Sequence, residues 1–79
     1  MRRRKRFASY HVRMRITVNG DAREYPDSVT VGSLLVALEL ASKPCAVEVN
    51  REVVPRRRHA EHALRDGDSI EIVTLVGGG

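Results

Sequence analysis

The sequence has few of the residues on which several common functions depend. It contains no tryptophan, one phenylalanine and two tyrosines, and these do not form the interleaved aromatic pattern on which single-stranded nucleic acids stack. Its one cysteine, Cys45, cannot form a disulfide within the chain. No apolar run is long enough to span a bilayer, and the basic start lacks the apolar stretch of a secretory signal. We therefore expect a cytoplasmic protein without a membrane segment.

The residue patterns that carry catalysis are also missing. The chain has no Walker loop and no Ser/His/Asp set. His59 and His62 are three residues apart, but no third and fourth ligand stands nearby, so we interpret them as part of a polar turn rather than a metal site. Cys45 is interpreted as a small, half-buried apolar residue. We predict that the domain is not an enzyme and binds neither a metal nor a cofactor itself.

The excess positive charge is confined to the start of the chain. The net charge is +4, but residues 1–13 hold six Lys/Arg and no Asp/Glu, which gives +6. Residues 14–79 hold eight Lys/Arg and ten Asp/Glu, which gives −2. We expect residues 1–13 to be a disordered, solvated extension. A nucleic-acid-binding module that uses this extension is an alternative from a different functional class.

Residues from position 14 onward begin with the pattern of a β-hairpin. The stretch "MRITV" alternates apolar and polar residues with the period of a half-buried strand. Asn19 and Gly20 form the dipeptide most typical of a tight hairpin turn. The stretch "AREYP" is the predicted return strand, and it ends at Pro26 because proline cannot donate to a ladder.

One amphipathic helix is predicted after the hairpin. Its apolar residues recur at i, i+3, i+4 and i+7, and they are Val31, Leu34, Leu35 and Leu38. Thr30 is a suitable N-cap, and Pro44 prevents any continuation. We expect about three helical turns.

Three further strands are predicted after the helix. The stretch "AVEVN" is the first of them, and a turn at residues 50–52 leads to a short strand, "VVP". A polar loop or helical turn held by Leu64 follows. A turn at residues 66–68 then leads to the last strand, "SIEIVTLV". The last strand gains most by lying centrally beside the first. This order predicts an α+β fold of the β-grasp or ubiquitin-like type, with a mixed, curved sheet of four to five strands packed on one main helix.

The last strand has more apolar residues than one face needs. Ile70 and Ile72 should face the helix, which leaves Val73 and Leu75 on the side of Glu71. A β-bulge that buries one of them is an alternative. We interpret Val73, Leu75 and the following Val76 as a patch for a partner, just before the end of the chain.

The sequence ends on three glycines, Gly77, Gly78 and Gly79. Extended, they reach about 10 Å, and without side chains they fit a channel too narrow for a Cβ. We divide the chain into an extension (1–13), a β-grasp domain (14–76) and a flexible glycine tail (77–79). A carboxylate that can be presented by a protein without catalytic residues indicates a carrier or substrate of another enzyme, whereas a merely flexible or cloning-derived tail is the alternative.

Five stretches together resemble the ThiS family of thiamine-biosynthesis sulfur carriers. They are "MRITVNGDARE", "TVGSLLVALEL", "AVEVNREVVPR", "LRDGDSIEIV" and the final "VGGG". The resemblance covers nearly all of residues 14–79 and does not include the basic extension. It implies that the group to be modified is the carboxylate of Gly79, with Gly77 and Gly78 completing the tail motif.

The resemblance also implies partners. A ThiF-like enzyme would use ATP and magnesium to adenylate Gly79, sulfur from a cysteine-desulfurase-type donor would give a thiocarboxylate, and a ThiG-like thiazole synthase would accept that sulfur. The small subunit of molybdopterin synthase and a ubiquitin-like protein modifier share this fold and tail, and they remain as alternatives.

Overall fold

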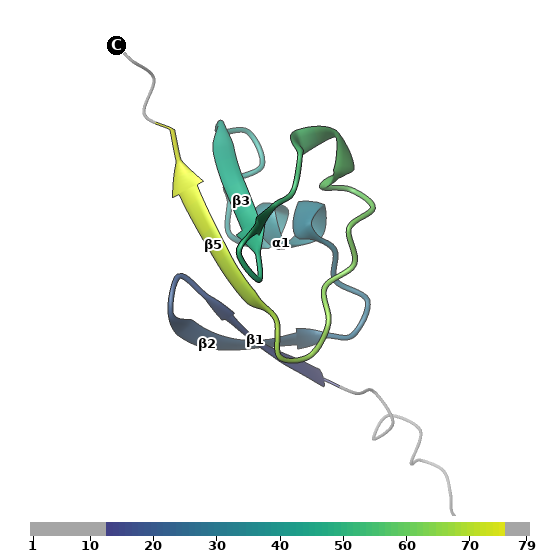
Figure 1. The fold of residues 1–79 in the computed structure, drawn as a ribbon. Coiled ribbons are helices and arrows are strands. Elements are labelled where there is room, and N and C mark those ends of the chain that lie inside the picture. Colours follow the sequence, from purple (N-terminus) through teal and green to yellow (C-terminus); the bar gives the residue numbers. More distant parts are fainter. Residues whose placement is uncertain (1–12, 76–79) are drawn as a thin grey trace, which may run out of the picture.

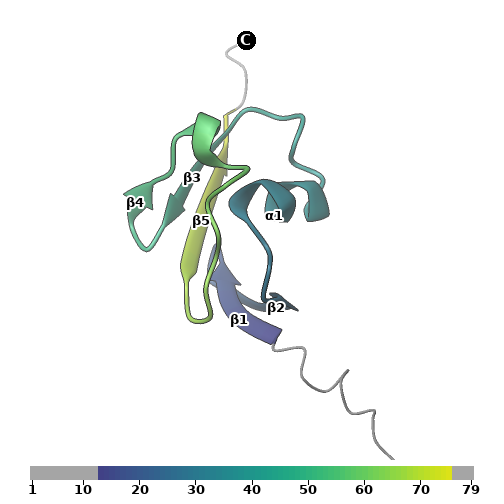
Figure 2. The ribbon, with the colours of Figure 1, turned by 90° about the vertical axis from the view of Figure 1, so that its right-hand side faces the viewer.

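The computed structural model describes residues 13–75, which fold into one five-stranded sheet and one α-helix. The sheet order is β2-β1-β5-β3-β4, and the helix lies against one face while the other face is uncovered (Figures 1 and 2). This is the predicted α+β β-grasp arrangement, with the last strand in the centre. The extension before Arg13 and the tail from residue 76 onward lie outside the described residues.

The first two strands form the predicted hairpin. Strand β1 (Arg13–Val18) pairs antiparallel with β2 (Asp21–Pro26). The two turn residues have positive φ, 51° at Asn19 and 87° at Gly20, which is the backbone that a two-residue hairpin turn requires. The Asn-Gly prediction is confirmed.

Helix α1 (Val31–Ala37) begins at the predicted N-cap. The side chain of Thr30 accepts a hydrogen bond from the Ser33 backbone N–H at 3.1 Å, and the Ser33 hydroxyl accepts one from the Thr30 backbone N–H at 2.8 Å. This reciprocal pair satisfies two donors that would otherwise have no partner at the helix start.

The helix is shorter than predicted. It has seven residues rather than about three turns, and it ends before Pro44 is reached. Glu39 adopts φ 62°, and the Leu40 N–H donates to the Leu35 carbonyl at 2.8 Å. On a continuous helix, Leu38 and Leu40 would point about 200° apart. Because the helix ends between them, both side chains pack against the core.

The segment after the helix contains two strands and a 3₁₀ turn. Strand β3 (Cys45–Val49) pairs with β4 (Glu52–Val53), which is shorter than the predicted strand "VVP". A 3₁₀ helix, η2 (Arg56–Arg58), follows. The Val54 side chain points inward and is buried, and its N–H still donates to the Val47 carbonyl of β3 at 2.9 Å.

The loop after η2 packs tightly on the start of α1. The Gly32 N–H donates to the His59 carbonyl at 2.7 Å, and a Cβ at Gly32 would lie 3.2 Å from the Cα of Ala60. Glycine at this position therefore permits a close approach, which accounts for its presence in the first helical turn. Leu64 anchors the same loop, as predicted, and is 3% exposed.

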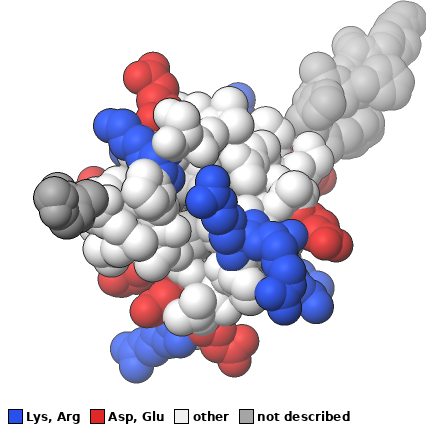
Figure 3. Space-filling model, turned by 90° about the horizontal axis from the view of Figure 1, so that it is seen from above, with Lys and Arg blue, Asp and Glu red and all other residues white. Residues whose placement is uncertain are grey.

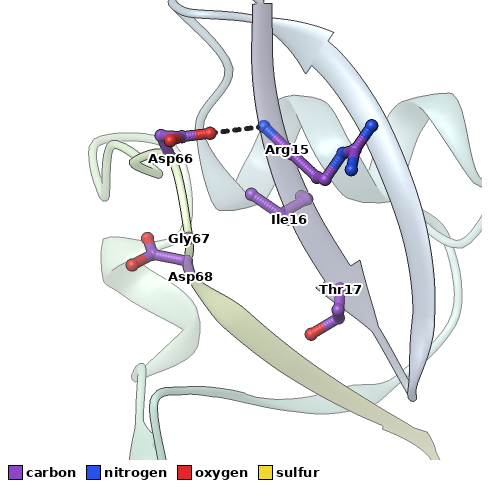
Figure 4. Close-up of a pocket in the computed structure, with 6 residues that line it drawn as sticks. All are labelled: Arg15, Ile16, Thr17, Asp66, Gly67 and Asp68. Atoms are coloured by element: carbon purple, nitrogen blue, oxygen red, sulfur yellow. Dashed lines mark hydrogen bonds between the residues drawn. The ribbon is translucent and has the colours of Figure 1, made fainter.

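Strand β5 (Ser69–Thr74) lies between β1 and β3. It runs parallel to β1 and antiparallel to β3. The turn before it docks along β1: the Asp66 carboxylate accepts from the Arg15 N–H at 2.7 Å, and the Gly67 N–H donates to the Arg15 carbonyl at 2.8 Å (Figure 4). This turn sets where β5 enters the sheet.

The core fills the space between the sheet and α1. Its buried apolar residues are Met14, Ile16, Val18, Val31, Leu34, Leu35, Val47, Val49, Val54, Leu64, Ile70 and Ile72. The predicted helical stripe and the predicted inward face of β5 both contribute to it. Within residues 13–75, no helix is long and apolar enough to cross a membrane.

The core predicts a contrast between two residues of α1. Leu34 is fully buried, so Leu34→Ala should lower the free energy of unfolding by about 2–5 kcal/mol through lost burial and the cavity that remains. Val36 is 65% exposed, and Val36→Ala should change it by no more than about 0.5 kcal/mol. Urea unfolding measures both, and equal effects would contradict this description of the core.

Candidate functional site

The uncovered face of β5 carries the predicted apolar residues. Val73 is 57% exposed and Leu75 is 51% exposed, so no bulge turns either of them into the core. Val73 lies opposite Ala46 of β3. The side-chain alternation predicted for this strand is confirmed, and it places an apolar surface next to the point where the described chain ends.

A third exposed apolar residue on the same face, Val53, was missed in the sequence. Val53 of β4 is 68% exposed and lies opposite Glu48 of β3. Val53 and Val54 are adjacent, so only one of them can face the core, and this alternation was the available signal. We call Val53, Val73 and Leu75, together with Ala46, the outer apolar surface.

Two carboxylates lie beside this surface. Glu48 of β3 and Glu71 of β5 are direct cross-strand partners, and like charges opposite each other destabilise a sheet. The one ion pair formed within residues 13–75 joins Arg15 to Glu24, so neither carboxylate is neutralised there. The outer face of the two central strands is therefore apolar at one end and negative at the other.

The end of the molecule toward which β5 runs has a different character. Seen from this end, an uncharged area lies beside a group of Lys and Arg side chains (Figure 3). The 3₁₀ helix η2, with Arg56, Arg57 and Arg58, is at the same end as the end of β5 (Figure 1). All three arginines are exposed.

Strand β5 is held on both sides up to Ile72. On the β3 side, the pairing continues to the Leu75 N–H, which donates to the Pro44 carbonyl at 2.8 Å. On the β1 side, the carboxamide of Asn19 takes over where β1 ends. Its oxygen accepts from the Ile72 N–H at 2.7 Å, and its NH₂ donates to the Ile72 carbonyl at 3.1 Å. Asn19 thus replaces the next residue of a neighbouring strand.

A second asparagine, Asn50, binds a main-chain group of β5 at the other end of the strand. Asn50 has φ 53°, close to the 51° of Asn19. Its carboxamide accepts from the Ser69 N–H at 2.9 Å and donates to the Asp68 carboxylate at 2.9 Å. Both residues were read from the sequence only as turn residues, and local sequence gives no signal for their contacts with β5.

Cys45 and His59, which were considered from sequence, both lie close to main-chain carbonyl oxygens of the fold. Cys45 is half-buried, and its Sγ lies 3.8 Å from the Leu40 carbonyl oxygen. The Nε2 of buried His59 lies 3.0 Å from the Val54 carbonyl oxygen. No group of three or more His, Cys, Asp or Glu that could hold a metal occurs within residues 13–75.

The shallow pocket between β1 and the turn at residues 66–68 is part of the fold. Its lining includes Asp66 and Asp68, whose carboxylates would otherwise attract a cation. Asp66 already accepts from the Arg15 N–H (Figure 4). Asp68 accepts from the Arg65 N–H at 2.8 Å and from Asn50. These bonds hold the turn, so the pocket is not a candidate ligand site.

The predicted tail motif, Gly77, Gly78 and Gly79, and the predicted interface residue Val76 lie outside the described residues. The structure describes the chain up to Leu75, which follows β5 directly. The described part of the candidate site is therefore the outer apolar surface, together with the hydrogen bonds that hold both edges of β5.

Comparison with known proteins gives a family match. A family model described as the ThiS family matches residues 16–79. The sulfur carrier protein ThiS of Bacillus subtilis is 40% identical over 65 residues, which are 81% of this chain and 98% of that protein. A crystal structure of the thiamine biosynthesis protein ThiS from Geobacter metallireducens has 36% identity and a TM-score of 0.72, covering 84% of this chain and 100% of that one.

One similar protein is much longer. A thiazole synthase of Paramagnetospirillum magneticum is 44% identical over 66 residues, which are 84% of this chain but 20% of that protein. The present chain thus spans about one fifth of this relative.

The two asparagines allow a matched test of the support of β5. Asn19→Gly and Asn50→Gly both keep a residue that tolerates positive φ, and each removes one carboxamide. Asn19→Gly should speed amide exchange at Ile72 about tenfold, because its acceptor is lost, and leave Ser69 nearly unchanged. Asn50→Gly should do the reverse. Residue-resolved hydrogen exchange measures both, and the same pattern in the two variants would contradict these roles.

Proposed function

Because this chain belongs to the ThiS family, its function is that of a sulfur carrier protein in thiamine biosynthesis, and we propose that the carboxylate of Gly79 is the group that carries the sulfur. The chain is a carrier on which enzymes act rather than an enzyme, as are the relatives named ThiS. The single observation that carries the proposal is that the family match runs to residue 79 and so includes all three glycines.

The carrier needs an activating partner for chemical reasons. A carboxylate is a poor electrophile, since resonance spreads its charge and oxide is a poor leaving group. A ThiF-like enzyme would bind Mg-ATP and join a Gly79 carboxylate oxygen to the α-phosphate with loss of pyrophosphate. The Gly79 acyl carbon then bears AMP, which is a good leaving group. ATP and magnesium belong to this partner in the proposal, and the carrier domain supplies no ligand for them.

Sulfur transfer would follow in two steps. The terminal sulfur of a cysteine persulfide, made by a cysteine-desulfurase-type donor, attacks the acyl carbon and displaces AMP. A thiol then reduces the resulting S–S bond, which leaves a thiocarboxylate on Gly79 and a disulfide between the donor cysteine and that thiol. The thiocarboxylate is an anionic, soft nucleophile, suited to delivering sulfur to a further enzyme.

The receiving enzyme in this proposal is a ThiG-like thiazole synthase. Support comes from the thiazole synthase of Paramagnetospirillum magneticum, which contains a region 44% identical to this chain. The matches to proteins named ThiS favour the thiamine pathway over molybdopterin synthesis or protein modification. The proposal includes a cytoplasmic location, where the ThiF-like enzyme and the sulfur donor would work.

The outer apolar surface is the proposed docking face for these partners. Val73 lies on β5 and Leu75 follows that strand directly, so both are next to Val76 and the tail in the chain. Extended, the three glycines reach about 10 Å. A partner that binds Val73 and Leu75 could therefore receive the Gly79 carboxylate in an active site about that far from Val76. Val53 enlarges this face at the sheet edge, and Glu48 and Glu71 provide negative charge beside it.

The proposal predicts a defined product. Incubation of the chain with a ThiF-like enzyme, Mg-ATP and a persulfide source should replace one oxygen at the C-terminus by sulfur, which intact-protein mass spectrometry detects. Removing Gly79, or changing Gly78→Leu, should abolish this product and leave thermal unfolding unchanged, since the described core is built from residues between Met14 and Ile72.

The control for this experiment is a chain that lacks residues 1–12, which should form the product at the full rate. Product formation by the chain without Gly79 would refute the assignment of the carrier group. Loss of product only in the chain without residues 1–12 would instead favour a function of the basic extension.

The docking face predicts a second result. Val73→Glu or Leu75→Glu should weaken binding to the ThiF-like enzyme about tenfold or more, because each places a charge in an apolar contact. Val36→Glu is the matched control, since Val36 is at least as exposed but lies on α1, on the opposite side of the sheet. Isothermal titration calorimetry measures all three, and an equal loss from Val36→Glu would rule out this face.

A further inference from the structure

Main-chain hydrogen bonding extends to different residues on the two edges of β5. Along a strand, the N–H and C=O of alternate residues point to the same side. On the β1 side these residues are Ile70, Ile72 and Thr74. The Ile70 carbonyl accepts from the Asn19 N–H at 2.8 Å, and both main-chain groups of Ile72 are bound by the Asn19 carboxamide. Hydrogen bonding on this side therefore extends as far as Ile72.

Thr74 is the next residue on this side, and nothing within residues 13–75 pairs with it there. The parallel pairing of β1 with β5 ends at Val18 and Ile70, and the chain turns away at Gly20 into β2. Figure 1 shows the β1–β2 hairpin beside one half of β5 only. On the opposite side the sheet continues, since the Leu75 N–H is bound to the Pro44 carbonyl. Among the described residues, the main-chain edge of Thr74 on the β1 side thus has no partner.

A groove of about 290 Å³ lies along this edge. Ile72 and Thr74 of β5 line it on one side, and Leu38 and Leu40, which follow α1, line it with apolar side chains. The β1–β2 hairpin completes the lining with Val18, Asn19, Asp21 and Arg23. Both leucines are only partly buried by the core, so part of their apolar surface faces the groove.

We propose that this groove receives one extended main-chain segment of the adenylating partner, which pairs with Thr74 as an added strand. The proposal rests on the function proposed above. A main-chain donor and acceptor at one strand edge are best satisfied by another extended main chain, which is how peptides add to exposed sheet edges. An apolar side chain of that segment would contact Leu38 and Leu40, because alternate residues of a strand point to the same face.

The groove lies where pairing with Thr74 would orient the tail. Thr74 lies immediately before Leu75 and the tail, and main-chain bonds here would fix the direction of the chain without requiring a side chain in the tail. Asn19 is then a positioning residue: its carboxamide occupies Ile72, so the partner strand can begin only at Thr74. The other possible occupant of this edge, a second copy of this chain, is distinguished by the experiments below.

Amide exchange tests the pairing directly. In the free chain the Thr74 N–H should exchange fast, and a saturating amount of a ThiF-like adenylating enzyme should slow it about tenfold or more. The Leu75 N–H, already bound to Pro44, should change less. Unchanged exchange at Thr74 in a chain that is fully bound would overturn the proposal. Slow exchange in the free chain that depends on chain concentration would also overturn it and assign the edge to a second copy.

A pair of variants tests its effect on the reaction. Thr74→Pro removes the donor, which a free strand edge tolerates, while Thr74→Val keeps the N–H and the shape of the side chain. Thr74→Pro should raise the KM for the chain in the adenylation reaction about tenfold with kcat little changed, and Thr74→Val should match the unaltered chain. Equal KM values in the two variants would overturn the proposal.

Two controls keep these outcomes separate. Thermal unfolding shows whether Thr74→Pro still folds, and if it does not, the exchange experiment on the unaltered chain decides. Thiocarboxylate formation by the unaltered chain is measured in the same preparations. Its absence would refute the proposed function, whereas its presence together with an unprotected Thr74 would refute only the docking of a strand in this groove.

Discussion

The register of β5 is the constraint on which the rest of the structure depends. Ile70 and Ile72 must face α1, and the period of two then leaves Val73 and Leu75 on the uncovered face. A slip of one residue would reverse both sets. The carboxamides of Asn19 and Asn50 oppose such a slip, because each binds a particular main-chain group of β5. The segment from Ser69 to Leu75 therefore supplies core packing at even positions and part of the outer apolar surface at odd ones.

Much of this arrangement is predictable from local pattern, because the features concerned are local. Alternation identifies β1 and β5, the Asn-Gly pair identifies the hairpin, and the spacing of Val31, Leu34 and Leu35 identifies the buried stripe of α1. The end of α1 is not predictable in this way. It depends on whether Leu40 packs better against a sheet formed by distant segments than it would on a continued helix.

The site was predictable in part for the same reason. Val73 and Leu75 follow from alternation, but Val53 requires knowing which of two adjacent valines turns inward. The bonds of Asn19 to Ile72 join residues 53 positions apart, and only the topology brings them together. The role proposed for Gly79 comes from family resemblance, since three glycines by themselves are equally consistent with an inert tail.

The parallel pairing of the first and last strands has a consequence for how the domain can be joined to others. Because β1 and β5 run in the same direction, the chain enters the sheet at one pole and β5 leaves it at the opposite pole (Figure 1). A fusion partner attached upstream of Arg13 would hang from the entry pole, where it obstructs neither the outer apolar surface nor the departing backbone. The fold can thus be joined to a domain before Arg13 without a change in the direction in which β5 leaves the sheet.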